Sequence, residues 1–337
     1  MASEQQQDRE IRWGIVGPGG IAGKVIKDFP YVPHARAVAV ASRSQQRADA
    51  FAAEHGLPLA YGSYRELIMS DEVDALYIAT PHPQHRDLAI AAAEAGKAVL
   101  VEKSFAATAV GAQKMITAAR AHGVFAMEAM WTRFQPAIVA VRELVDAGAI
   151  GEVRQVQADL GVNRPYDPAD RLYDPAQGGG AALDLGVYVV SLALYFLGRP
   201  DTINARGSLA PTGVDADAAL LLGYQDGRVA SLITTLRHQT PGAARLTGTE
   251  GWIDILPRFH HPSAFVITRA GQEPERIERP QTGGGYCHEL IEVTEGIRAG
   301  RTESSIMPLD DTLAVQETLE EACRQLGVEH REDDHVL

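Results

Sequence analysis

A glycine-rich segment near the start of the chain constrains its fold more than any other feature. Residues 11–17 form a short apolar run, and the ten residues that begin at Gly14 read GIVGPGGIAG. The spacing G-x-G-x-x-A from Gly17 onward is typical of a dinucleotide-binding turn, in which the glycines allow a tight turn and close approach of the backbone to a pyrophosphate. A plain glycine-rich turn is the alternative. The motif follows an apolar run and opens a helix pattern, so we predict a cofactor site that includes Gly17, Gly19, Gly20 and Ile21.

Strand and helix patterns alternate from residue 11 to about residue 127. Short apolar runs predict strands at 11–17, 37–42, 74–79, 98–101 and 124–127. Between them, patterns that end at glycine or proline predict helices at 20–29, 45–55, 85–95 and 110–122. Such alternation implies parallel βαβ units, so residues 1–128 are expected to form a Rossmann domain with a doubly wound parallel sheet.

The rhythm changes after about residue 130. Strand patterns recur at 152–161, 202–209, 217–224, 228–236, 244–249, 252–256 and 264–269, and helix patterns at 134–147, after Gly180, at 285–299 and at 310–326. The segment Gln225-Asp226-Gly227 between two strands predicts a hairpin. The sequence therefore predicts an α/β protein whose second domain, residues 129–337, is α+β with a largely antiparallel open sheet. We expect this domain to bind substrate and to form the dimer contact.

Charge and cysteine content exclude several classes of protein. The chain of 337 residues has 31 Lys and Arg against 44 Asp and Glu, a net charge of −13 that disfavours nucleic-acid binding. Its two cysteines, Cys287 and Cys323, cannot form a disulfide framework. The first ten residues are polar, unlike a signal peptide, and no run of about 18 uninterrupted apolar residues suggests a membrane partner. These features predict a cytoplasmic protein.

The end of the second predicted strand bears on the cofactor. An NAD-selective site places an acidic residue there for the ribose hydroxyls. This chain has Ser42 and Arg43 instead, which would bind a 2′-phosphate. An arginine that is only solvated in a turn is the alternative. The pattern favours NADP(H), with NAD(H) still possible.

Two further segments follow strands at the edge where open α/β sheets bind ligands. They read Thr80-Pro81-His82-x-x-His85 and Glu102-Lys103-Ser104. These resemble the hallmarks of the Gfo/Idh/MocA oxidoreductase family, Thr-Pro-Asn-x-x-His and Glu-Lys-Pro, with one departure in each. Ser104 replaces a proline that the family often has in cis. The resemblance implies a cofactor site lined by Thr80, Pro81, His82, His85, Glu102 and Lys103.

Two segments of the second half narrow the resemblance. Residues 127–136 read MEAMWTRFQP, and residues 178–188 read GGGAALDLGVY. They are similar to the family branch of dimeric dihydrodiol dehydrogenases and NADP-dependent xylose dehydrogenases. In an α-helix Asp184 and Tyr188 would share one face. The resemblance implies that Lys103, Tyr188 and Asp184 are catalytic; a hydrogen-bonded structural aspartate and a core tyrosine are the alternatives.

These residues together predict a reaction. We expect an NADP(H)-dependent oxidoreductase that transfers hydride between the nicotinamide and a sugar or cyclic diol, at a carbinol or carbonyl carbon. Tyr188 would act as the acid/base, and a nearby Lys103 cation would favour its tyrosinate form. Trp131 and Arg133 would line the cofactor cleft, and Trp131, Asn163, Arg171 and Tyr188 would contact substrate. Another sugar reaction of the family, on anhydrofructose or inositol, and a non-catalytic NADP-binding regulator are the alternatives.

Two further expectations concern metals and assembly. The pairs His82/His85 and His260/His261 lack further ligands at metal-binding spacing, so we expect no metal. Residues 218–224 are apolar at almost every position, whereas a strand with one solvated face should alternate. We therefore expect both faces of this strand to be covered, the second by another copy of the chain in a homodimer. The alternative is that the late helices cover that face.

Overall fold

The computed structural model describes residues 10–337 as two compact units. The first unit contains the chain up to Met130 together with Thr282–Thr312 and Glu332–Leu337. The second contains Trp131–Gln281 and Leu313–Arg331. The helix predicted at 285–299 and the C-terminal tail, both expected in the second domain, thus group with the first unit, whereas most of the helix predicted at 310–326 stays in the second. The first nine residues, for which we expect no signal peptide, lie outside the described residues.

The sheet of the first unit is parallel and has the strand order β3-β2-β1-β4-β5-β6. Its strands are β1 (Ile11–Val16), β2 (Ala35–Ala41), β3 (Leu59–Tyr61), β4 (Ala75–Ile78), β5 (Ala98–Glu102) and β6 (Ala126–Ala129). The order reverses between β1 and β4, so right-handed crossovers place successive helices on opposite faces. The predicted Rossmann fold is confirmed, and the short strand β3 is an addition to it.

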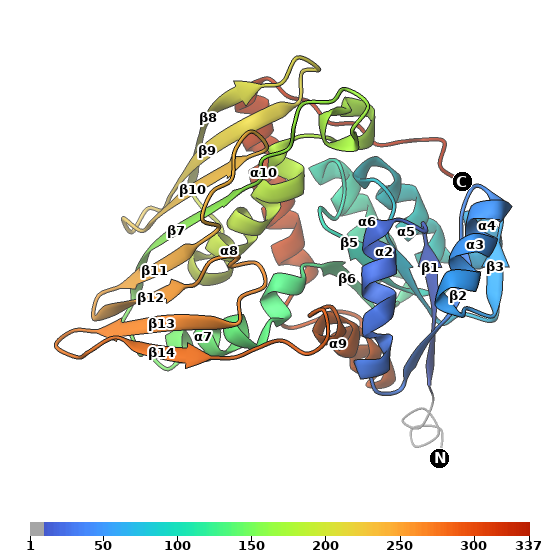
Figure 1. The fold of residues 1–337 in the computed structure, drawn as a ribbon, viewed down its shortest axis with the longest axis horizontal. Coiled ribbons are helices and arrows are strands. Elements are labelled where there is room, and N and C mark those ends of the chain that lie inside the picture. Colours follow the sequence, from blue (N-terminus) through green and yellow to red (C-terminus); the bar gives the residue numbers. More distant parts are fainter. Residues whose placement is uncertain (1–9) are drawn as a thin grey trace. The chain divides into compact units, whose positions relative to one another are not determined.

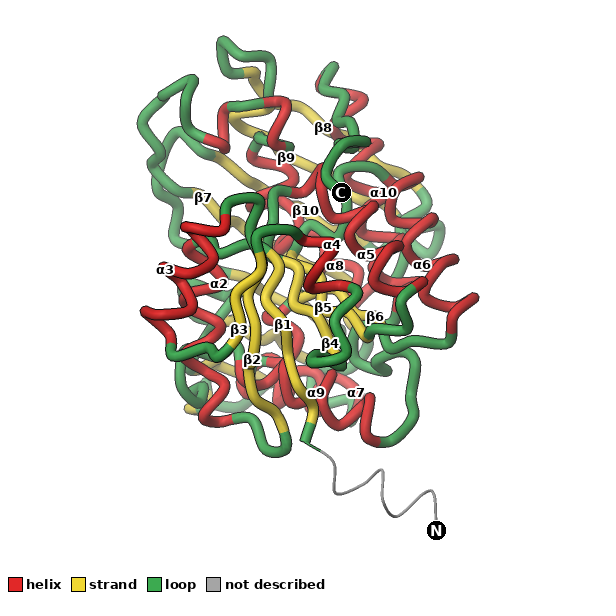
Figure 2. The backbone as a smooth tube through the Cα atoms, turned by 90° about the vertical axis from the view of Figure 1, so that its right-hand side faces the viewer, coloured by secondary structure: helices red, strands yellow, loops and turns green. Residues whose placement is uncertain are grey.

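Several helices of this unit end close to the glycine residues at which the sequence predicted their ends. They are α2 (Gly20–Val25), α3 (Gln45–His55), α4 (Tyr64–Ile68), α5 (His85–Glu94), α6 (Ala109–His122) and α9 (Cys287–Arg298). Figure 2 shows α2 and α3 toward the β3 side of the strands and α5 and α6 toward the β6 side. The Gly56 and Gly123 caps are left-handed, as glycine allows. The predicted helix 20–29 instead changes to a 3-10 turn at Ile26, four residues before Pro30.

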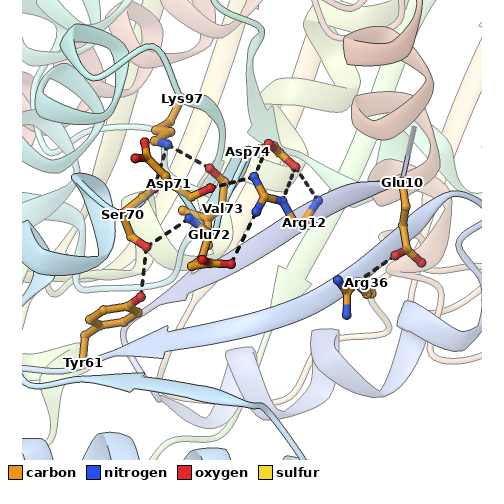
Figure 3. Close-up of polar contacts among 10 residues, drawn as sticks. All are labelled: Glu10, Arg12, Arg36, Tyr61, Ser70, Asp71, Glu72, Val73, Asp74 and Lys97. Atoms are coloured by element: carbon orange, nitrogen blue, oxygen red, sulfur yellow. Dashed lines mark hydrogen bonds and ion pairs between the residues drawn. The ribbon is translucent and has the colours of Figure 1, made fainter. Parts of the chain in front are cut away.

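At the amino ends of its strands, this sheet is stabilised by the hydrogen bonds of Arg12. Arg12 Nε and Nη2 donate to the two carboxylate oxygens of Asp74, each at 3.0 Å, and Nη2 also donates to Asp71 O at 2.7 Å (Figure 3). Lys97 Nζ donates to Ser70 O and Val73 O in the same turn. These contacts join β1 and the turn before β4 at the end of the sheet away from the glycine-rich turn.

The sheet of the second unit is mixed, with the order β14-β13-β12-β11-β7-β10-β9-β8 (Figure 1). Its strands are β7 (Val153–Gly161), β8 (Thr202–Leu209), β9 (Asp215–Gly223), β10 (Val229–Thr235), β11 (Ala244–Gly248), β12 (Gly251–Ile255), β13 (Ala264–Arg269) and β14 (Glu275–Glu278). Only the pairing of β7 with β10 is parallel among the described strands of this sheet. The largely antiparallel expectation is therefore confirmed.

Three helices accompany this sheet: α7 (Pro136–Asp146), α8 (Val187–Leu197) and α10 (Leu309–Leu326). Nearly every residue of α8 is buried. The stretch Pro175–Leu197 is long and apolar enough to cross a membrane by length and composition alone, but 94% of the tested window is buried inside the protein. It therefore has the burial of a core helix.

The strand β9 has two faces with different burial within a single chain, so the expectation that another copy of the chain covers the second face stays a prediction. Leu220 and Leu222 are buried, whereas Leu221 is 49% exposed. On β10, the neighbour of β9, Ile233 is 47% exposed. The apolar run at 218–224 therefore did not indicate which of its side chains face the core and which face outward. Among the described residues, the late helices leave Leu221 and Ile233 open.

Candidate functional site

The glycine-rich turn lies at the carboxyl end of β1. Gly17 has a φ of 96°, and a Cβ there would lie 3.0 Å from Thr80 Cγ2 and 3.1 Å from Ala79 O. A side chain on Gly20 would meet no atom within 4 Å among the described residues, and one on Gly19 only Ala79 O at 3.9 Å. Packing within the protein thus requires Gly17 but not Gly19 or Gly20. Close approach of a pyrophosphate to the backbone would instead require glycine at positions 19 and 20.

The end of β2 carries hydroxyl and guanidinium groups. Ser42 is buried and its Oγ accepts a hydrogen bond from Ser44 N at 3.3 Å, whereas Arg43 is exposed. Burial raises the pKa of Tyr64, and the positive charges of Arg43 and Arg47 counteract that rise. Both guanidinium groups therefore lie near one phenol. They place two positive charges beside the carboxyl end of β2.

His85 is fully buried between two loops of the first unit. Its Nε2 lies 2.7 Å from Thr80 O, and its Nδ1 lies 3.1 Å from Ser104 O and 3.2 Å from Phe105 O. Burial lowers the pKa of His85 to about 4, so the ring is neutral at pH 7. Its polar atoms face backbone carbonyls of the loops that follow β4 and β5. His82 is also buried, with its ring centroid 5.9 Å from that of His85.

The loop after β5 rests on a group of buried acids. Tyr77 Oη donates to Glu102 Oε1, and Lys103 N donates to Glu102 Oε2 at 3.2 Å. The Lys103–Ser104 peptide bond is cis. Glu289 on α9 is fully buried, and this burial, with Glu102 and Glu128 nearby, raises its pKa well above the usual range. Sequence analysis missed Glu289, since a single glutamate in a helix gives no signal of a buried partner.

The second unit gathers aromatic rings around Tyr188. Trp131 Nε1 donates to Tyr188 Oη at 3.1 Å. The ring of His260 lies 5.1 Å from that of Tyr188, and the ring of His261 lies 5.4 Å from that of Trp131. Thr132 Oγ1 donates to His260 O at 2.8 Å and so ties the two segments together. Sequence analysis considered these histidines only as metal ligands and missed their place in this cluster.

The other predicted substrate and cofactor residues of this unit are placed differently. Asp184 is buried, and its Oδ1 accepts from Arg171 Nη2 at 3.0 Å. Arg133 is only 2% exposed, with its guanidinium 4.6 Å from the ring centroid of Tyr195. Asn163 is exposed. The structure thus brings Trp131 to Tyr188 and Arg171 to Asp184, while burial limits what Arg133 can reach.

The segment that carries Asp184 differs from the expected α-helix. Residues Ala182–Gly186 form a π-type turn directly before α8, which begins at Val187. Such turns are frequent at functional sites. The wider turn changes the angular offset between Asp184 and Tyr188, so the simple four-residue spacing argument does not describe their relation.

The parallel sheet, its glycine-rich turn and the strand-end residues define a protein of the dinucleotide-binding oxidoreductase class. The chain belongs to the Gfo/Idh/MocA oxidoreductase family. Residues 11–130 match the model of the oxidoreductase family with an NAD-binding Rossmann fold, and residues 138–254 match the GFO/IDH/MocA C-terminal domain. The predicted family membership and the predicted enzyme class are thereby confirmed.

Curated relatives and solved structures agree with this assignment. The trans-1,2-dihydrobenzene-1,2-diol dehydrogenase of Macaca fuscata fuscata is 37% identical over 96% of this chain and 99% of its own length. The human protein of the same name is 35% identical over 96% and 99%. The structure of aldose-aldose oxidoreductase from Caulobacter crescentus, complexed with glycerol, has a TM-score of 0.85 at 28% identity, over 95% of this chain and 98% of that one. A 3-ketoreductase from Actinomadura kijaniata, in complex with NADP and TDP-benzene, has a TM-score of 0.82 at 25% identity, over 96% and 100%.

Proposed function

We propose that this protein is an NADP(H)-dependent dehydrogenase or reductase of small polyhydroxylated molecules, a sugar or a cyclic diol. The observation that carries the proposal is the hydrogen bond from Trp131 Nε1 to Tyr188 Oη within a cluster of aromatic rings. Membership of an oxidoreductase family, and relatives named for a diol and for aldoses, support the substrate class.

The part of the first unit up to about residue 128 is proposed as the dinucleotide-binding domain, with Thr282–Thr312 and Glu332–Leu337 grouped with it. The backbone at Gly17, Gly19, Gly20 and Ile21 would hold the pyrophosphate, because a helix start presents free N–H groups there. Ser42 and Arg43 would hold the 2′-phosphate, with Arg47 adding a second guanidinium. NADP bound in a related solved structure is in keeping with this choice. NAD(H) would bind the same pyrophosphate contacts but would leave Arg43 without its partner.

The loops after β4 and β5 are proposed to lie beside the nicotinamide end. Thr80, Pro81, His82, Glu102 and Lys103 would line this part of the site. His85 is assigned a positioning role instead of a direct contact, because both ring nitrogens already face backbone carbonyls. It would hold the loop that carries Lys103.

A bound nicotinamide supplies or accepts the hydride at the reacting carbon. Tyr188 is proposed to give or take the proton at the reacting oxygen, which is the usual task of a general acid or base. The indole N–H of Trp131 donates to the Tyr188 oxygen, and a donor in that position stabilises the anionic form. Lys103 would add a positive charge with the same effect. The Arg171–Asp184 ion pair and Asn163 would bind substrate hydroxyls, while Arg133 supports the site from its buried place.

Assembly and location complete the proposal. The open face that carries Leu221 and Ile233 is proposed as the contact between two copies of the chain. The second unit, which makes up most of the predicted domain 129–337, would then serve both substrate and dimer. A cytoplasmic location fits two cysteines that are thiols in the structure.

The test is a panel of cyclic diols and aldoses as substrates, once with NADP⁺ and once with NAD⁺. Turnover is measured by the absorbance of the reduced nicotinamide that forms. The proposal expects turnover of at least one diol or aldose and a higher kcat/KM with NADP⁺. Turnover of an anhydrosugar or an inositol alone would favour the alternative reactions of the family. Tight NADP⁺ binding without turnover of any substrate would favour the non-catalytic regulator.

A further inference from the structure

Three side chains of the second unit converge at one point apart from the proposed reaction. Asp215 begins β9, Cys323 lies in the last turns of α10, and His330 follows Cys323 by seven positions. One ligand atom from each lies within 4.8 Å of the others, and Cys323 Sγ lies 3.8 Å from His330 Nε2. Asp215 is more than one hundred positions away along the sequence, so the spacing of histidines could not indicate this group.

The three donor atoms are those that zinc takes in proteins. Zinc binds thiolate sulfur at about 2.3 Å and imidazole nitrogen at about 2.0 Å, and a tetrahedral angle then separates the two donors by about 3.5 Å. The observed 3.8 Å between Cys323 Sγ and His330 Nε2 is close to that value. Magnesium and calcium prefer all-oxygen sites, so the mixed donor set selects against them.

The hydrogen bonding of Asp215 provides a second, independent observation. Its Oδ2 accepts from Ala182 N at 2.6 Å, whereas its fully buried Oδ1 makes no hydrogen bond of ordinary geometry, although the backbone N–H groups of Ala181 and Asp215 also act on the carboxylate. A buried carboxylate oxygen without a partner is costly. A cation between Asp215, Cys323 and His330 would supply the missing partner.

The surroundings also suit a cation. The charges of Asp217 and Glu320 act on Asp215 and Cys323 respectively, and the carboxyl end of α10 carries partial negative charge. His330 is half-buried and so gives a route from solvent.

A nucleophilic thiol is the rival interpretation, since a cysteine beside a histidine can be activated. Cys323 is only 2% exposed, and burial raises the pKa of its thiol well above the usual range. A substrate could not reach this buried sulfur. A metal ion can displace the thiol proton where histidine alone does not.

We propose that Asp215, Cys323 and His330 bind one Zn²⁺ ion, with water at the fourth position. Binding forms a zinc–sulfur bond and releases the Cys323 thiol proton to solvent, while His330 and Asp215 donate lone pairs. The ion would join the start of β9, the end of α10 and the segment after it. It would therefore stabilise the second unit.

The test uses the full chain, stripped with a chelator and dialysed against Zn²⁺. We expect about one zinc per chain by elemental analysis, a zinc-dependent rise in Tm, and a thiolate-to-metal absorption band when Co²⁺ replaces zinc. In Cys323→Ser and His330→Gln, zinc affinity should fall at least about tenfold. Cys287→Ser, which removes the other buried thiol, is the control and should bind like the wild type.

Asp215→Asn is unsuitable because Asp215 also accepts from Ala182 N. If Cys323→Ser does not fold, the half-buried His330→Gln decides the result. Less than about one tenth of an equivalent of zinc in the wild type would overturn the proposal, as would a cobalt spectrum without the thiolate band. Equal zinc affinity in wild type and His330→Gln would overturn it too. None of these measurements depends on turnover, so they stand apart from the proposed reaction.

Discussion

Arg43 is the residue on which the proposed cofactor preference depends. Arg43→Asp should weaken NADP(H) binding about ten- to a hundredfold, because it removes a charge-assisted hydrogen bond worth ~1.5–3 kcal/mol and adds repulsion of the 2′-phosphate. NAD(H) binding should change little. Fluorescence titration with each cofactor measures both constants. Arg36→Asp, with the same charge change at the other end of β2, is the control. Equal losses for both cofactors with Arg43→Asp would refute the assignment.

Tyr188 is the residue on which the proposed proton transfer depends. Tyr188→Phe keeps the ring and deletes only the hydroxyl, so kcat should fall by ~10² or more while cofactor affinity stays nearly constant. Tyr195→Phe on the same helix α8 makes the same deletion at a half-buried ring beneath Arg133 and should leave kcat close to the wild type. Steady-state kinetics on the best panel substrate measures both. A Tyr188→Phe enzyme with normal kcat would move the acid/base role to another group.

His85 links protonation to the stability of the first unit. Burial holds its pKa at about 4 in the folded chain, below the ordinary value of about 6.5 in the unfolded chain. The unfolded state therefore binds more protons between these values, and stability falls as pH drops through the window. The loss should reach about 1.6 kcal/mol between pH 6.5 and pH 5.

Urea unfolding at several pH values measures this dependence. His85→Gln, although less stable at neutral pH, should lose about 1.6 kcal/mol less than the wild type over the same interval. His122→Gln replaces an exposed histidine at the end of α6 and should keep the wild-type slope. Parallel slopes for wild type and His85→Gln would show that His85 is not the titrating group.

At the scale of elements, the six-stranded sheet has stabilising contacts at the amino ends of its strands and the proposed cofactor site at their carboxyl ends. Arg12 joins β1 to the turn before β4, whereas Gly17 lies about 17 Å further along at ~3.3 Å per residue. Arg12→Ala should lower the free energy of unfolding by about 1–2 kcal/mol, since the pair with Asp74 is partly exposed. Its kcat and cofactor affinity should stay unchanged, because the change is far from the glycine-rich turn.

The matched control for that prediction lies on the neighbouring strand. Arg36 pairs with Glu10 at 2.8 Å, but both side chains are more than half exposed (Figure 3). Arg36→Ala should therefore change stability by less than about 1 kcal/mol. Chemical denaturation of both variants, with kinetics alongside, gives the comparison. A loss of cofactor affinity in Arg12→Ala would contradict the prediction that the amino ends of the strands do not affect cofactor binding at their carboxyl ends.

At the scale of the whole molecule, the open face of the eight-stranded sheet predicts an assembly. A specific homodimer should bury more than ~1,200 Å² in total. Leu221→Arg places a charge on that face, beside the exposed Ile233 of β10, and should yield monomers in analytical ultracentrifugation. Leu222 is fully buried, so it cannot serve for this test. Met69→Arg, at a 65% exposed position of the first unit, should leave the dimer intact. A wild-type monomer at micromolar concentration would end the proposal.

Local patterns in the sequence determined most of the secondary structure. Gly56 and Gly123 ended helices where expected, because left-handed caps need only the residue itself. The turn at Gly17 and the strand before it were likewise set by neighbours along the chain. The family followed from short motifs of the same kind, at Thr80, Glu102 and Tyr188.

Tertiary structure alone decided what depends on residues distant in the sequence. Apolar residues at 218–224 did not reveal that Leu221 faces outward, because facing is set by pairing with β8 and β10. His260 meets Tyr188, and Glu289 joins the acids near Glu102, only once the chain has folded. Asp215, Cys323 and His330 are the strongest case. Their three side chains converge only because three separate segments of the chain fold together, and no local sequence pattern indicates such a convergence.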